Sequence, residues 1–156
     1  MNKATVQKAK RELWKVRLEQ AELARMQRQK KKLGYDMLPS GISYDRDRIQ
    51  SSPSDAFTDK MIAAAELSRK IDRQIAKLLT HKAQVMDRIT RMDDPTCRIL
   101  LELRYLGEDE HMYTWSEVAT IMQYSEAAVF KIHDRALQMY AKARSTRNKT
   151  DSEVYS

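Results

Sequence analysis

Apolar residues recur every three or four positions along two long stretches of the chain, as they do in a helix with one apolar stripe. In residues 53–92 the steps alternate between four and three residues over about five heptads, which is typical of coiled coils. Ser52 and Asp55 form a capping box there, and Pro53 suits the first helical position. The stripe consists of Phe57, Met61, Ala64, Ser68, Ile71, Ile75, Leu78, Lys82, Val85, Ile89 and Met92. Such a helix would be about 60 Å long and needs a partner that covers its stripe. Either the first helix folds back on it, or a second copy of the protein packs against it.

Residues 3–32 show the same spacing and predict a first long helix. Its stripe consists of Val6, Ala9, Leu13, Val16, Gln20 and Leu23. Residues 33–52 then interrupt the helical pattern, with Gly34 and the Pro39-Ser40-Gly41 run as breakers. Because this linker also contains several apolar residues, we expect it to pack on the neighbouring helices. Residues 1–92 therefore form one predicted part of the chain, either as a monomeric hairpin or within an oligomer.

Two short apolar stripes follow one another closely near the carboxyl end. Thr114 and Glu117 form a capping box before the first, and Ser125 caps the second. Helices so close together must cross steeply and share a small core, with Ala119 at the point of closest approach. Gln123 stands where such turns often have glycine, so the turn must accept strain or another geometry. The pattern predicts a helix-turn-helix.

Asp94 and Pro95 predict the start of a further, very apolar helix that ends at Gly107 and completes a three-helix core. The helix-turn-helix domain is expected over residues 93–144, and a disordered tail over residues 145–156. The fold class is all-α, with a long helical hairpin or coiled-coil segment followed by the three-helix domain.

The composition narrows the possible functions. The chain has 156 residues, a net charge of +7 and an isoelectric point near 9.5. Residues 3–32 carry eleven basic and three acidic side chains, so this basic arm holds about all of the excess charge. An anionic partner is favoured, and nucleic acid more than membrane because the apolar stripe is narrow. One cysteine, Cys97, and no apolar leader or spanning run indicate a cytoplasmic protein without membrane association.

Nothing in the sequence suggests catalysis. His81, His111 and His133 fall in three different predicted elements, and none has metal-ligand spacing to Cys97. No glycine-rich loop is present that would hold a phosphate. Residues 108–110 are three adjacent acids, which we interpret as a solvated loop. We expect no enzyme activity, no cofactor and no metal.

The second helix of the helix-turn-helix, residues 125–141, is the predicted recognition helix, because the N-terminal half of that helix enters the major groove. Its base-reading surface would consist of Ser125, Glu126, Ala127, Phe130, Lys131, Asp134 and Arg135. Phosphate contacts are expected from Thr114, Lys30, Lys31, Lys32, Lys142 and Arg144. The base-reading surface is of mixed charge, so phosphate contacts elsewhere must help.

Residues 99–137 resemble region four of bacterial sigma factors through the runs ILLELRYL and TWSEVA and through Ser125, Val129 and Ile132. The runs YDMLP at 35–39 and RIQSSPSD at 48–55, before a long heptad helix, are similar to phage regulators of the ArpU/RinA type. This resemblance, over about residues 33–141, implies a DNA-binding activator of phage late genes for packaging and lysis. It also implies that the protein is located in the cytoplasm of the bacterial host cell and that host RNA polymerase is a candidate partner.

In that alignment the base-reading positions of sigma factors are usually polar or basic, and Ala127 and Phe130 depart from this. Either residue could contact a thymine methyl group, or Phe130 could face a protein. The first hypothesis is a sequence-specific, dimeric regulator bound to double-stranded DNA. The second is an adaptor that docks on RNA polymerase or a phage protein. The third is a DNA-packaging subunit resembling a small terminase, which would form a ring larger than a dimer.

Overall fold

The computed structural model describes residues 2–37, 55–108 and 110–154, with only the backbone described at 37 and 145–154. Those ranges contain five α-helices and no strand, which confirms the all-α class. Helix α1 is Lys3–Met37 and helix α2 is Asp55–Thr90. The expected end of the first helix at residue 32 was too early, because one glycine, Gly34, costs a helix only about 1 kcal/mol. The expected capping box at Ser52 and the packing of the linker lie mostly outside the described residues.

The chain divides into two compact units. Unit 1 comprises Met1–Gln20 with Leu78–Ser156, and unit 2 comprises Ala21–Lys77. This is a different division from the one at residue 92 that the sequence suggests. It arises because the first part of α1 and the last part of α2 pack with the three later helices.

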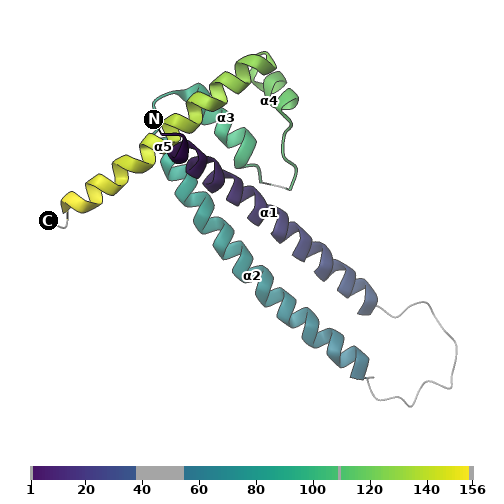
Figure 1. Cartoon of the computed structure of the whole chain (residues 1–156). Helices are drawn as coiled ribbons and strands as arrows, with labels where there is room; N and C mark the ends of the chain where they lie inside the picture. Colours follow the sequence, from purple (N-terminus) through teal and green to yellow (C-terminus); the bar gives the residue numbers. More distant parts are fainter. Residues whose placement is uncertain (1, 38–54, 109, 155–156) are drawn as a thin grey trace, which may run out of the picture. The chain divides into compact units, whose positions relative to one another are not determined.

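In unit 1 the first part of α1 runs antiparallel to the last part of α2 (Figure 1). Glu12 forms an ion pair with Arg88, and Glu19 Oε2 lies 2.6 Å from His81 Nδ1, so the numbers rise in one helix as they fall in the other. The apolar stripes of the two segments are buried as predicted: Ala9, Leu13 and Val16 on α1, and Leu78, Val85 and Ile89 on α2.

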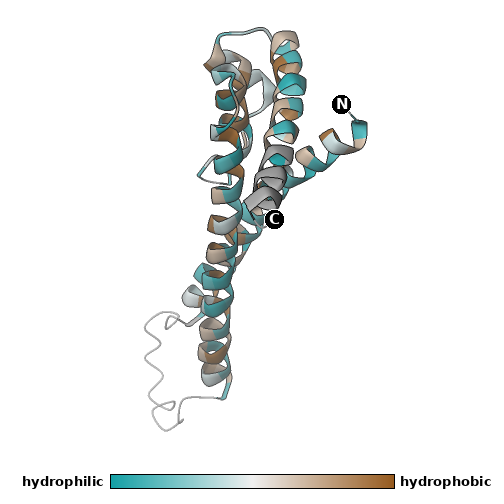
Figure 2. Ribbon diagram, turned by 90° about the vertical axis from the view of Figure 1, so that its left-hand side faces the viewer, coloured by the Kyte–Doolittle hydropathy of each residue, from teal (hydrophilic) through white to brown (hydrophobic). Residues whose placement is uncertain are grey.

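In unit 2 the stripe is covered only in part. Leu23, Leu67 and Ile71 are buried, whereas Phe57 and Met61 are exposed although the sequence places them in the seam. A groove of about 650 Å³ lies between the two helix segments of this unit, with Met26 and Leu33 of α1 and Ala63 and Leu67 of α2 in its lining. Along both helices, hydrophobic and hydrophilic residues alternate (Figure 2).

The remaining helices belong to unit 1. They are α3, Pro95–Tyr105; α4, Trp115–Met122; and α5, Glu126–Val154. Asp94 caps α3 as predicted, since its Oδ1 accepts hydrogen bonds from the amides of Thr96 and Cys97 at 2.9 and 3.4 Å. Helix α3 ends at Tyr105, not at Gly107, and it buries Cys97, Leu100, Leu101 and Tyr105 while Ile99 is exposed.

Helix α5 is longer than the sequence suggests. It runs to Val154, through residues 145–154, for which we predicted disorder. Between Glu126 and Val154 there is neither glycine nor proline, so no residue stops the helix.

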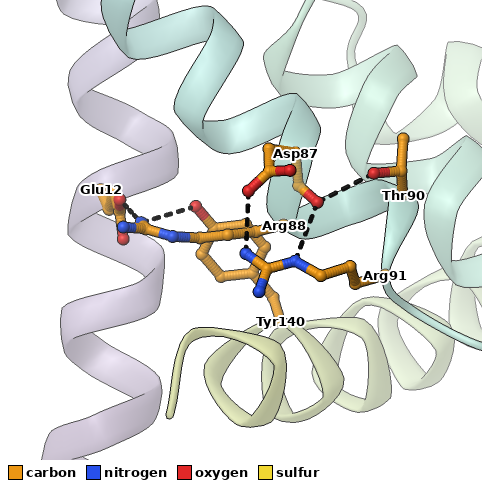
Figure 3. A network of polar contacts seen from close by, with 6 residues as sticks. All are labelled: Glu12, Asp87, Arg88, Thr90, Arg91 and Tyr140. Carbon is orange, nitrogen blue, oxygen red and sulfur yellow. Dashed lines mark hydrogen bonds and ion pairs between the residues drawn. The ribbon is translucent and has the colours of Figure 1, made fainter. Parts of the chain in front are cut away.

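A polar network joins α1, α2 and α5 in unit 1 (Figure 3). Arg88 of α2 pairs with Glu12 of α1 and donates from NH1 to the hydroxyl of Tyr140 on α5, at 3.4 Å. Tyr140 is completely buried, and burial raises the pKa of its hydroxyl. Beside it, Arg91 pairs with Asp87 one turn away at 2.9 Å. The network fixes α5 against the paired ends of α1 and α2.

Candidate nucleic-acid interface

The turn between α4 and α5 is tightly hydrogen-bonded. Thr114 and Glu117 form the predicted capping box, in which the Glu117 amide donates to Thr114 Oγ1 at 3.2 Å. Gln123 ends α4 in the left-handed conformation, with φ 59° and ψ 41°, so the turn does adopt the strained geometry that glycine would ease. The amide of Tyr124 donates back to the Ala119 carbonyl at 3.0 Å. Ser125 Oγ accepts from the Ala128 amide at 3.2 Å and so caps α5.

The two helices share the small core that the sequence predicts. Val118 and Ala119 of α4 are buried, as are the stripe residues Val129, Ile132 and Ala136 of α5. The small side chain at Ala119 allows a close approach of the helices. The side of α5 opposite this core therefore faces outward.

Every residue of the predicted base-reading surface is exposed. These residues are Ser125, Glu126, Ala127, Phe130, Lys131, Asp134 and Arg135. Arg135 is engaged, because its NH2 lies 2.9 Å from Oδ2 of Asp94 at the start of α3. The other cation of this surface is Lys131. Among the described residues it has no ion-pair partner.

The predicted phosphate contacts are distributed over both units. Thr114 is exposed, but its hydroxyl oxygen accepts the hydrogen bond of the capping box. A phosphate at this position would therefore contact the N-terminus of α4 and not a free Thr114 side chain. Lys142 is exposed, while Arg144 is half-buried with NH1 3.7 Å from Glu12 Oε2. Lys30, Lys31 and Lys32 are exposed but belong to unit 2.

Phe130 packs against an aromatic cluster centred on Trp115. The ring of Trp115 lies 5.3 Å from that of Phe130 and 4.7 Å from that of His133, and the Arg104 guanidinium stands 4.2 Å over the indole. Phe130 is still 46% exposed. One side of this ring therefore packs on protein, and the other is available to a partner.

His133 is a core residue that was not predicted from the sequence. It is buried, and its Nε2 lies 2.8 Å from the hydroxyl of Tyr105. Burial, with the charge of Lys10, lowers the pKa of His133 to about 4, and burial raises the pKa of Tyr105 to about 12. Both side chains are neutral near pH 7, so the contact is a hydrogen bond between two uncharged groups. The spacing could have revealed it, since residue 133 lies four positions after buried Val129 and three before buried Ala136.

A second unforeseen feature is the support of the loop after α3. Arg17 is buried and donates from NH2 to the Glu110 carbonyl at 3.0 Å, and Gln20 donates to the Glu108 carbonyl at 3.0 Å. Lys82 donates to the Gly107 carbonyl at 3.3 Å, which gives this polar seam position a partner. Backbone carbonyls of this loop thus accept hydrogen bonds from side chains of α1 and α2. One cation of the basic arm, Arg17, is therefore structural.

The described residues contain no group of three or more His, Cys, Asp and Glu side chains arranged to hold a metal ion. Cys97 is buried, and burial raises the pKa of its thiol, so the thiolate is disfavoured. Its Sγ lies 3.9 Å from the Ile132 carbonyl.

Comparison of the sequence with protein-family models found no match, and comparisons with curated proteins and with solved structures found none either. Among the described residues, none of the helices combines the length and apolar character that crossing a membrane requires.

Proposed function

We propose that the chain is a sequence-specific DNA-binding transcription regulator, acting on phage late genes in the manner of the ArpU/RinA-type proteins that it resembles. In this proposal α4 and α5 form a helix-turn-helix with α3 as the third helix of its core. The paired long helices form a hairpin, and a second copy covers the exposed seam near Phe57 and Met61. The observation that carries the proposal is that every residue of the predicted base-reading surface of α5 is exposed, next to the short hydrogen-bonded turn that joins α5 to the capped helix α4.

The geometry supports groove entry in three ways. The α4–α5 turn is short and hydrogen-bonded, so α5 projects as a rigid rod from its core. Its N-terminal half carries small or polar residues, Ser125, Glu126 and Ala127, which permit close approach to base edges. Lys131 stands one turn further along the same surface and can donate to guanine or phosphate oxygens.

The test is capture of fragmented phage and host DNA by the purified protein over a series of salt concentrations, followed by sequencing. We expect one or a few sites that persist near physiological salt. Lys131→Ala should weaken binding to such a site about tenfold or more, whereas Lys8→Ala, which removes an exposed lysine of α1, should change it far less. Uniform recovery of all fragments that vanishes as salt rises would contradict sequence reading.

A protein-docking function is the second candidate, because exposed apolar side chains surround the turn. Ile121, Tyr124 and Phe130 are 49, 47 and 46% exposed. Glu126 and Asp134 offset the positive charge nearby, which suits a protein surface better than a phosphate backbone. Co-purification with RNA polymerase in the absence of specific DNA binding, abolished by Phe130→Ser, would favour this function.

A further inference from the structure

Unit 1 contains a cavity of about 430 Å³ that is distinct from the outer surface of α5. Four of its lining residues, Gln7, Lys10, Arg11 and Trp14, come from α1. Arg104 and Tyr105 of α3 and Trp115 of α4 complete the wall. The volume lies within the range of about 300–1,000 Å³ that is usual for small-ligand pockets.

The electrostatics of the cavity favour an anion. Three of the residues that line it are cationic, and none of the described lining residues is acidic. Arg104 is partly buried, its guanidinium donates to the Tyr113 carbonyl, and desolvation lowers the pKa of this guanidinium. The neighbouring His133 has its pKa lowered by burial and by Lys10, although Asp134 opposes this. Three cations with no acidic residue among the described lining residues favour the binding of an oxyanion.

The aromatic residues of the cavity favour a planar ring in the same ligand. The Trp115 indole already has Arg104 over it and Phe130 and His133 against it. Trp14, by contrast, is 42% exposed, and the described residues show no ring contact for it. An exposed indole beside cations is the arrangement on which nucleobases stack.

We propose that this cavity binds a nucleotide, with its base on the Trp14 indole and its phosphate near Lys10, Arg11 and Arg104. The source is either a free mononucleotide or one unit of a single strand, since both present the same chemistry. Gln7 is exposed and supplies a side-chain amide for contacts with base or sugar. The proposal does not depend on DNA reading by α5, which uses another surface.

The chain offers a direct probe of this site, because its only two tryptophans both line the cavity. Adenosine 5′-monophosphate, adenosine, inorganic phosphate and an oligodeoxyadenylate single strand are each titrated into the full-length protein, with tryptophan emission as the readout. Equilibrium dialysis with labelled adenosine 5′-monophosphate confirms the stoichiometry. We expect saturable quenching by the nucleotide with a Kd of about 0.1 mM or tighter, and binding of adenosine or phosphate alone that is weaker by about tenfold or more.

The variants separate the cavity from general charge effects. Lys10→Gln combined with Arg11→Gln should weaken nucleotide binding about tenfold or more. Lys8→Gln on the same helix, and Lys131→Gln on α5, should leave it unchanged. All replaced residues are exposed, and far-UV circular dichroism verifies that the variants stay helical.

The outcomes are distinct. Displacement of adenosine 5′-monophosphate by the oligonucleotide at lower concentration would support the site and assign it to a strand. Preference for the mononucleotide would support the site and assign it to a free nucleotide. Absence of saturable binding by either, equal binding of phosphate alone, or an unaffected Lys10/Arg11 double variant would overturn the proposal. Retention of nucleotide binding by a protein without specific DNA binding would show that only the DNA-reading proposal had failed.

Discussion

His133 links a buried contact to the pH dependence of stability. Its pKa is about 4 in the folded protein and near 6.5 when it is solvated. Between these values the unfolded chain binds a proton that the folded chain does not, so acidification favours unfolding. The free energy of unfolding should therefore fall as the pH is lowered from 6.5 to 4, by at most about 1.4 kcal/mol per pH unit from this residue.

Urea denaturation at a series of pH values measures this slope, and His133→Gln should flatten it between pH 4 and 6.5. His111→Gln provides a matched control, because His111 is exposed. If the slope in this window were the same for His133→Gln as for the unchanged protein, the neutral buried histidine would be ruled out as its cause.

At the scale of the elements, the α4–α5 turn is the place where local geometry costs stability. Gln123 is the one non-glycine residue with positive φ in the described chain. Gln123→Gly should stabilise the protein by about 1 kcal/mol, because glycine adopts this conformation without the penalty of a Cβ atom. Thermal and urea denaturation measure the change.

The control for this variant is Gln138→Gly, the same substitution at an exposed position inside α5. There glycine should destabilise by about 1 kcal/mol, since it loses more backbone entropy in a helix. Destabilisation by both variants to the same extent would contradict the assignment of strain to the turn.

The features that could be predicted from the sequence are those formed by residues close to one another along the chain. The caps at Asp94, Thr114 and Ser125 join residues two or three positions apart, so their spacing alone identified them. The contacts of Tyr105 with His133 and of Arg17 with the Glu110 carbonyl could not be predicted, because each joins residues that are far apart in the sequence. The α2 stripe was identified, but periodicity did not foresee that Phe57 and Met61 at its start are exposed.

At the scale of the molecule, the basic arm is less uniform than its composition suggests. Arg17 is buried under the loop after α3, and Arg25 is paired with Glu22 at 2.6 Å. Lys30, Lys31 and Lys32, at the far end of α1, are by contrast all exposed and consecutive. In the described part of unit 2 these three lysines are the longest consecutive run of exposed cations, so they are the candidates for contact with neighbouring phosphates.

Replacement of all three by glutamine should weaken binding to every DNA sequence alike, because phosphate contacts carry no sequence information. The slope of log affinity against log salt concentration should become shallower by about 2 to 3, close to 0.9 for each phosphate that the protein no longer neutralises. Fluorescence anisotropy with a specific and a random duplex over a salt series gives both quantities. The ratio of the two affinities should stay constant, since the α5 surface is untouched.

A second triple variant, in which Lys60, Lys70 and Lys77 of α2 become glutamine, makes the same change in net charge within unit 2. These lysines are exposed but spread over about five helical turns, so they cannot face consecutive phosphates from one patch. If phosphate binding is local to the end of α1, this variant should retain most of the salt slope. Equal decreases in affinity for the two variants would mean that DNA responds to the total charge of the chain, and the arm would then have no site of its own.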